Sequence, residues 1–148
     1  MNMSLQNWLS NGWLVAHQTS PQEISDLLAV AERDLKDSQT PGLSPDWRLN
    51  ISYNAALQAA NAALAACGYR ASREAHHYRI IQSLIYTIGA APEIVTQLDR
   101  FRKKRNIGAY DRAGAVSDQE ASEMLHFTQN ILQEIKEWLR KNHPEFLE

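Results

Sequence analysis

The feature that most constrains the fold of this chain is a stretch of 21 residues, Leu49–Tyr69, that carries no charged side chain. Its length would suffice to cross a bilayer, but eight of its residues are alanines, which partition weakly into lipid. Five polar side chains also interrupt it: Asn50, Ser52, Asn54, Gln58 and Asn61. Its apolar residues fall on two sides of a helix. We therefore predict a central helix buried within the protein, with no membrane-spanning segment and no membrane partner.

The rest of the chain repeats its apolar residues with the helical period, and no window alternates convincingly with the period of two that is typical of strands. We predict helices over about 5–16, from Pro21, over about 46–67, from an N-cap at Ser72 to Gly89, from Pro92, and from Ser117 or Asp118 to about 141. In the fourth helix we expect five side chains to face the core: Tyr78, Ile81, Leu84, Ile85 and Ile88. These patterns predict an all-α helical bundle of about five to six helices with a long C-terminal helix.

Two helix ends carry specific signals. Gly68 is expected to end the third helix in a left-handed conformation. Ser117 and Glu120 have the spacing of a capping box at the start of the last helix. Both signals place a helix boundary at a defined residue.

The size and composition of the chain fit a single domain, 1–148, with N-terminal helices and a loop (1–44) ahead of a core bundle (45–142). The net charge of −2 does not by itself indicate a partner. The single cysteine, Cys67, excludes an intramolecular disulfide and suggests a reducing compartment. The first 22 residues contain no Lys, Arg, Asp or Glu, so they lack the basic region of a secretory signal. We expect a cytoplasmic protein.

Charge is concentrated in the segment Arg100–Arg112, where six basic residues and one acid give a local charge of +5, so that the remainder carries −7. Such a cluster suits phosphates or an acidic partner, although a solvated helix face would also explain it. Arg105 stands apart because it continues the apolar seam of this helix, four positions after Phe101. A guanidinium on that seam must find a partner or open into a cleft or subunit interface. Lys103 and Lys104 lie off the seam and are expected to be solvated.

The run Arg105–Tyr110, placed before a long final helix, resembles the signature of the HEPN superfamily of small helical domains. That signature is an Arg followed after four to six residues by a His, often with an Asn next to the Arg. The segment Tyr53–Leu64 is similar to the Ala- and Gln-rich second helix of the family. His77 and Leu84 fall where the family commonly has a His and a Leu on the next helix. The resemblance covers about Arg48–Leu139.

The resemblance implies a dimer that brings two copies of the motif together, as in members that are metal-independent ribonucleases. In those members the His acts as acid or base toward a ribose 2′-hydroxyl, and the Arg stabilises phosphate charge. Here Tyr110 stands where the His is expected, and a phenol with a pKa of about 10 is a poor base at neutral pH. The candidates for catalysis are Arg105 and Tyr110. The candidates for ligand binding are Arg102, Arg105, Asn106, Arg112 and His77.

The remaining reactive side chains favour structural roles. The adjacent His76 and His77 point about 100° apart on a helix and cannot jointly hold one metal ion. His77 shares a helix face with Leu84, which is typical of a hydrogen-bonded histidine in a core or cleft. Cys67 lies on a buried stripe, where packing is more common than nucleophilic catalysis. Since no spacing of ligands resembles a zinc site and no phosphate-binding loop motif is present, we expect no metal and no cofactor.

Three functions remain open at this stage. The first is a homodimer that binds RNA or another phosphate-bearing ligand in a basic cleft, with degenerate or no catalysis. The second is a non-enzymatic interaction module that binds an acidic protein, such as an antitoxin-like partner. The third is a metal-independent endoribonuclease, in which Tyr110 or another group replaces the missing histidine.

Overall fold

A computed structural model of the protein describes residues 3–110 and 116–147, with side chains for all of these except 3–4 and 106–110. The described residues form six α-helices, two short strands and a final 3-10 turn. The helices are α1 (Met3–Ser10), α2 (Pro21–Asp37), α3 (Pro45–Ala66), α4 (His76–Thr87), α5 (Pro92–Tyr110) and α6 (Asp118–Asn142). The strands are β1 (Leu14–Ala16) and β2 (Tyr69–Ala71), and the turn η1 covers Pro144–Phe146. The predicted all-α bundle with a long C-terminal helix is confirmed.

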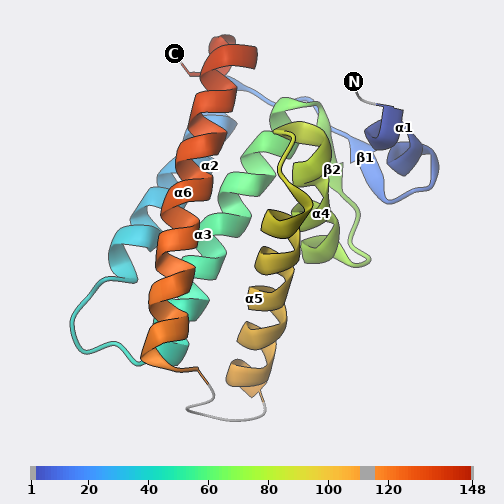
Figure 1. The fold of residues 1–148 in the computed structure, drawn as a ribbon. Coiled ribbons are helices and arrows are strands. Elements are labelled where there is room, and N and C mark those ends of the chain that lie inside the picture. The colour runs from blue at the N-terminus through green and yellow to red at the C-terminus, as the bar shows by residue number, and fades with distance from the viewer. Residues whose placement is uncertain (1–2, 111–115, 148) are drawn as a thin grey trace.

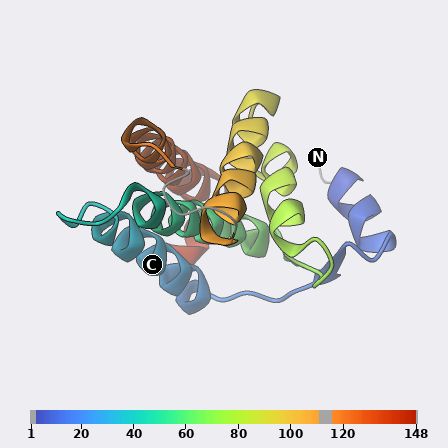
Figure 2. The ribbon, with the colours of Figure 1, turned by 90° about the horizontal axis from the view of Figure 1, so that it is seen from below.

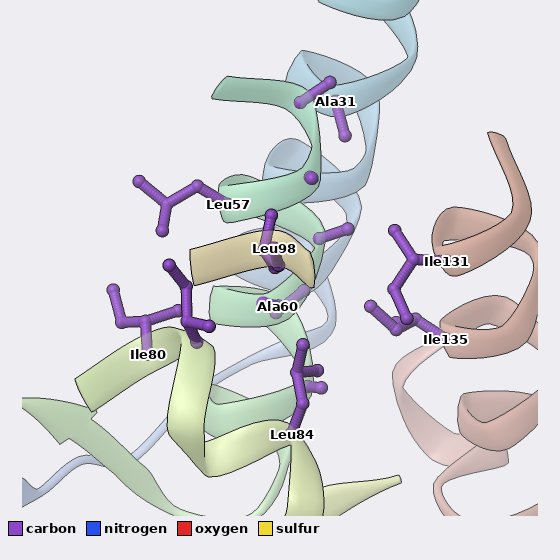
Figure 3. Close-up of a cluster of buried hydrophobic side chains, with 14 of the residues drawn as sticks. Ala31, Leu57, Ala60, Ile80, Leu84, Leu98, Ile131 and Ile135 are labelled. Carbon is purple, nitrogen blue, oxygen red and sulfur yellow. The ribbon is translucent and has the colours of Figure 1, made fainter. Parts of the chain in front are cut away.

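Helix α3 is the centre of the bundle, with α2 and α6 on one side and α4 and α5 on the other (Figures 1 and 2). All eight alanines of the charge-free stretch are buried on it. Their short side chains let the neighbouring helices approach closely, and the buried residues of α2, α4, α5 and α6 gather around Leu57 and Ala60 of α3 (Figure 3). The predicted central helix is therefore confirmed. Among the described helices, none is both long and apolar enough to cross a bilayer.

Helix ends follow the local chemistry of their residues. Ser20 and Ser44 cap α2 and α3, and in both helices a Pro occupies the first position, where its missing N–H costs nothing. The predicted capping box is present, since Ser117 and Glu120 each accept a hydrogen bond from the other's backbone N–H. Gly68 follows the end of α3 with a φ of 95°, as predicted.

The prediction of a helix over 5–16 is wrong in its second half, where the structure has a short strand that the sequence pattern does not indicate. Helix α1 ends at Ser10, Gly12 has a φ of 78°, and β1 then pairs antiparallel with β2. Two strands of three residues are too short to show a period of two. They exist because their backbones pair across a long sequence distance, with Leu14 opposite Ala71.

Two predictions for the fourth helix are also wrong. Ser72 is not its N-cap, because the Ser72 hydroxyl donates to the carbonyl of Gly12 at 2.7 Å and α4 begins only at His76. The helix is entered through Ala75, which adopts the left-handed conformation with a φ of 52°. Tyr78 does not face the core, since 38% of it is exposed. The later start follows from β2, which holds the chain in an extended conformation up to Ala71, and it leaves Tyr78 in the first turn of α4.

Candidate functional site

Arg105 lies where α5 crosses α3. Its Nε donates a hydrogen bond to Oδ1 of Asn50 at 2.8 Å, and its Cζ lies 5.2 Å from the ring centroid of Tyr53. Arg105 is half-buried. Its position on the apolar seam of α5 brings it to a hydrogen-bond partner on the central helix, as one of the alternatives expected from the sequence. Because Asn50 is a neutral acceptor, this pairing leaves the positive charge of Arg105 uncompensated by its partner.

Tyr53 connects Arg105 to His77 on α4. Its hydroxyl lies 3.2 Å from Nδ1 of His77, and the two ring centroids are 5.9 Å apart. Burial raises the pKa of Tyr53 to about 12, so the phenol keeps its proton at neutral pH and can donate it to Nδ1. A neutral imidazole that accepts at Nδ1 carries its own proton on Nε2. With the hydrogen bond in this direction, His77 is a hydrogen-bond donor through Nε2.

The charge state of His77 depends on the same surroundings. Partial burial lowers its pKa from the ordinary 6.5, and the charges of Arg105, His76 and Arg102 lower it further. Both effects disfavour the imidazolium. At neutral pH the site therefore combines two guanidinium groups with an uncharged histidine.

Arg102 lies one turn before Arg105 and faces α4. Its Nε donates to Oδ1 of Asp99 at 2.7 Å, and its Cζ lies 5.8 Å from the ring centroid of Tyr78. A hollow of about 500 Å³ opens beside it, lined by Ala75, His76, His77, Tyr78 and Arg102. Arg102 and His77 thus meet at one concave surface, to which α4 and α5 both contribute.

The backbone at the edge of this hollow is strained. A residue with a Cβ loses about 1–2 kcal/mol in the left-handed conformation, and Ala75 adopts it at the start of α4. Such conformations persist only where the surrounding structure imposes them, and they are common at functional sites. This left-handed residue directly precedes His76 and His77 at the start of α4.

The other basic residues of the segment have different surroundings. Lys103 is exposed, as predicted, with its Nζ 3.6 Å from Oδ2 of Asp99. The prediction that Lys104 is solvated is wrong, because its Nζ lies 3.3 Å from Oε2 of Glu120 and the side chain is 31% exposed. This ion pair connects α5 to the capping box of α6. Arg100 is exposed on α5 and lies about 200° around the helix from Arg102.

Three predicted site residues are not placed by the structure. Asn106 and Tyr110 belong to the final turns of α5, and their side chains lie outside the described residues. Arg112 lies outside the described residues altogether. The structure does bring together Arg102, Arg105 and His77, three of the predicted ligand-binding residues.

Sequence reasoning missed Asn50 and Tyr53 as parts of the site. Both belong to the charge-free stretch, where Tyr53 followed the apolar stripe and Asn50 was one of several interrupting amides. The available signal was the spacing of three residues, which puts both side chains on one face of α3.

Reactive groups elsewhere have simpler explanations. Burial raises the pKa of the Cys67 thiol to about 11, which favours the unreactive thiol form. Within the described residues, no three His, Cys, Asp or Glu side chains gather where they could hold a metal ion. A second hollow, between α5 and α6, is lined in part by Glu123 and Glu134, whose charges would repel a phosphate.

A family model of the HEPN domain matches residues 24–138. The chain belongs to the HEPN domain family. The match includes every element of the Arg105–Tyr53–His77 arrangement in this HEPN protein, and it leaves α1 and β1 outside. A search of curated proteins finds no match to the chain.

Proposed function

We propose that this HEPN protein binds RNA or another phosphate-bearing ligand on the face formed by α4 and α5. The observation that carries the proposal is the meeting of Arg102 and His77 at one hollow, with Arg105 joined to His77 through Tyr53. Guanidinium groups bind phosphates through paired N–H donors. The Nε2 proton of His77 adds a further donor on the same side.

The same geometry favours binding over catalysis. A general base needs a free lone pair on the nitrogen that faces the substrate. When the Tyr53 phenol donates to Nδ1 of His77, the neutral imidazole carries its proton on Nε2, and Nε2 is then a donor rather than a base. Tyr110 stands in the motif position of the catalytic histidine, and a phenol, with an ordinary pKa of about 10, is a poor base at neutral pH. We therefore propose that catalysis is degenerate or lost.

We also propose that the protein is a homodimer, because the resemblance to HEPN ribonucleases implies that two copies of the arginine share one cleft. A two-fold arrangement would place two α4–α5 faces on one ligand and raise the number of phosphate contacts. Analytical ultracentrifugation measures this directly. A monomer at the concentrations used for RNA binding would contradict the dimer while leaving binding to one face intact.

Binding of a labelled RNA at increasing salt tests the function. The logarithm of the association constant should fall linearly with the logarithm of salt concentration. Arg102→Ala and Arg105→Ala should each weaken binding severalfold and reduce that slope by about one. Arg100→Ala is the matched control, since it removes the same charge from another side of α5. No binding at low salt, or equal losses in all three variants, would overturn the proposal.

A ribonuclease remains the second candidate, supported by the proximity of His77 to Arg105. It requires the imidazole to adopt the opposite tautomer, with the proton on Nδ1. Incubation of RNA with the wild type, His77→Ala, Tyr110→Phe and Arg105→Ala tests for ribonuclease activity. Cleavage lost in His77→Ala alone would identify His77 as the general base.

Capture of a single acidic protein without any RNA binding would favour the non-enzymatic interaction module instead.

A further inference from the structure

Four side chains form a continuous row of alternating rings and guanidinium groups across α1–β1, α4 and α5. The Cζ of Arg79 lies 3.7 Å from the ring centroid of Trp13 and 5.6 Å from that of Tyr78. The Cζ of Arg102 lies 5.8 Å from the Tyr78 centroid. We call Trp13, Arg79, Tyr78 and Arg102 the aromatic–arginine ladder. Its last two members line the hollow that holds His77.

The ladder is built into the fold. Trp13 packs edge-to-face on Trp8 at 5.8 Å between centroids, and Trp8 packs in the same way on Tyr86 of α4 at 5.5 Å. The backbone N–H of Ser72 donates to the carbonyl of Trp13 at 3.0 Å, next to the β1–β2 pair. These contacts fix Trp13 beside Arg79 even though Trp13 itself belongs to a short connection.

Both rings of the ladder nevertheless remain open to solvent. Trp13 is 37% exposed and Tyr78 is 38% exposed. The segment from Arg70 to Arg79, which includes Tyr78, contains three arginines and one acid, Glu74. An exposed aromatic surface bordered by positive charge suits a ligand that is flat, apolar on its faces and attached to anions. The unpaired bases of a single-stranded nucleic acid have this chemistry.

Trp13 lies outside the segment that matches the HEPN family model, which begins at residue 24. The α1–β1 segment therefore contributes the Trp13 ring, which lies outside the part of the chain that matches the family model. It adds this ring next to the face where the proposed function places phosphates.

We propose that the aromatic–arginine ladder stacks the unpaired bases of a single-stranded RNA whose phosphates contact Arg102. This inference rests on the proposed function and specifies its ligand as single-stranded RNA. A duplex keeps its bases stacked on one another and offers the ladder only its backbone. The ladder therefore discriminates between single strands and duplexes.

The test compares three labelled ligands of equal length: a single-stranded RNA, the same strand with abasic sites, and the duplex. The wild-type protein should bind the intact single strand at least fivefold more tightly than the abasic strand, since stacking is worth about 1–3 kcal/mol per base. Trp13→Leu and Tyr78→Leu should lose this preference and bind the abasic strand as the wild type does. Trp47→Leu is the matched control, because Trp47 is 59% exposed and lies in the first turn of α3.

Two conservative variants separate stacking from folding. Trp13→Phe and Tyr78→Phe keep a ring and should retain most of the preference, while circular dichroism and thermal melting monitor the fold of every variant. Equal affinity of the wild type for intact and abasic strands would overturn the ladder proposal while phosphate binding stands. No affinity for any of the three at low salt would overturn the proposed function as well. A Trp13→Leu protein that keeps its RNA preference and changes only its oligomeric mass would show a subunit interface and overturn the ladder.

Discussion

Nε of Arg105 donates a hydrogen bond to Oδ1 of Asn50 at 2.8 Å, although the two residues lie 55 positions apart. The bond joins the basic end of α5 to the charge-free central helix. Arg102, by comparison, bonds the carboxylate of Asp99. A neutral acceptor orients a guanidinium without cancelling its charge, so Arg105 can still attract a phosphate. An Asn rather than an acid at position 50 therefore suits a site in which Arg105 binds an anion.

Replacing that neutral acceptor by a carboxylate should separate folding from binding. We expect Asn50→Asp to keep the contact with Arg105 as an ion pair and to change the unfolding free energy by no more than about 1 kcal/mol. RNA affinity should fall by at least about tenfold, because a hydrogen bond to a charged group is worth about 1.5–3 kcal/mol and the carboxylate competes for it. Fluorescence anisotropy and urea denaturation measure the two quantities.

The control for this change is Asn61→Asp, which adds the same charge to the same helix. The two positions are separated by about 16 Å along the helix axis, beyond the screening length of about 8–10 Å at moderate salt. Asn61→Asp should therefore leave RNA affinity close to that of the wild type. Equal losses in both variants would mean that only the total charge of the protein matters.

The pH dependence of His77 gives a second prediction. Its pKa in the folded protein lies below 6.5, so below pH 6.5 the unfolded chain takes up a proton that the folded protein does not. The free energy of unfolding should consequently decrease as the pH falls from 6.5 through the pKa of folded His77. His77→Gln should remove this part of the decrease. NMR titration of the imidazole resonances, assigned with the help of His76→Gln, measures the pKa.

A phosphate ligand reverses this shift. An anion beside His77 stabilises the imidazolium, so saturating RNA should raise the pKa of His77 and binding should strengthen as the pH falls toward 6. His76 is the adjacent histidine, so the His76→Gln protein must show the same rise in the pKa of His77. A His77 pKa that stays unchanged on RNA binding would place the ligand elsewhere.

Regular periodicity made most of the fold predictable. The alanine-rich segment and the spaced apolar residues of α6 specify buried helix faces through local sequence alone, and Gly68 and Ser117 mark their ends. The strand pair was not predictable, because β1 has three residues and forms only through pairing with β2. That long-range pairing also moved the start of α4 from the predicted Ser72 to His76.

The residues of the candidate site likewise include one that the sequence pattern indicates and others that only long-range contacts reveal. Arg105 was recognisable from the sequence because a charged residue on an apolar seam conflicts with its surroundings. Asn50 and Tyr53 obey the pattern of a buried helix, so only their contacts with Arg105 reveal their role. Lys104 was misjudged because its partner, Glu120, lies on another helix.

The strained residue at the edge of the hollow supports a fourth prediction. Ala75→Gly should raise the free energy of unfolding by about 1 kcal/mol, since glycine adopts a φ of 52° without a Cβ clash. Ala31→Gly is the control at a buried position inside α2, and it should lower stability. Thermal and urea denaturation test both variants. A lower free energy of unfolding for Ala75→Gly would contradict this prediction. It would show that contacts of the Ala75 methyl group stabilise the turn by more than its left-handed backbone costs.

The close packing around α3 supports the last prediction. Ala60 is fully buried and lies among side chains of the surrounding helices (Figure 3). Ala60→Leu adds three carbon atoms to a filled space and should lower the free energy of unfolding by about 1–3 kcal/mol. Ala29→Leu makes the same change at an exposed position of α2, and its free energy of unfolding should stay within about 0.5 kcal/mol of that of the wild type.

The Ala60→Leu substitution should also affect RNA binding, because α3 carries Asn50 and Tyr53. A shift of α3 in Ala60→Leu should weaken RNA binding at temperatures where the protein is still folded. An Ala60→Leu protein as stable as Ala29→Leu would mean that the space beside Ala60 accommodates a larger side chain.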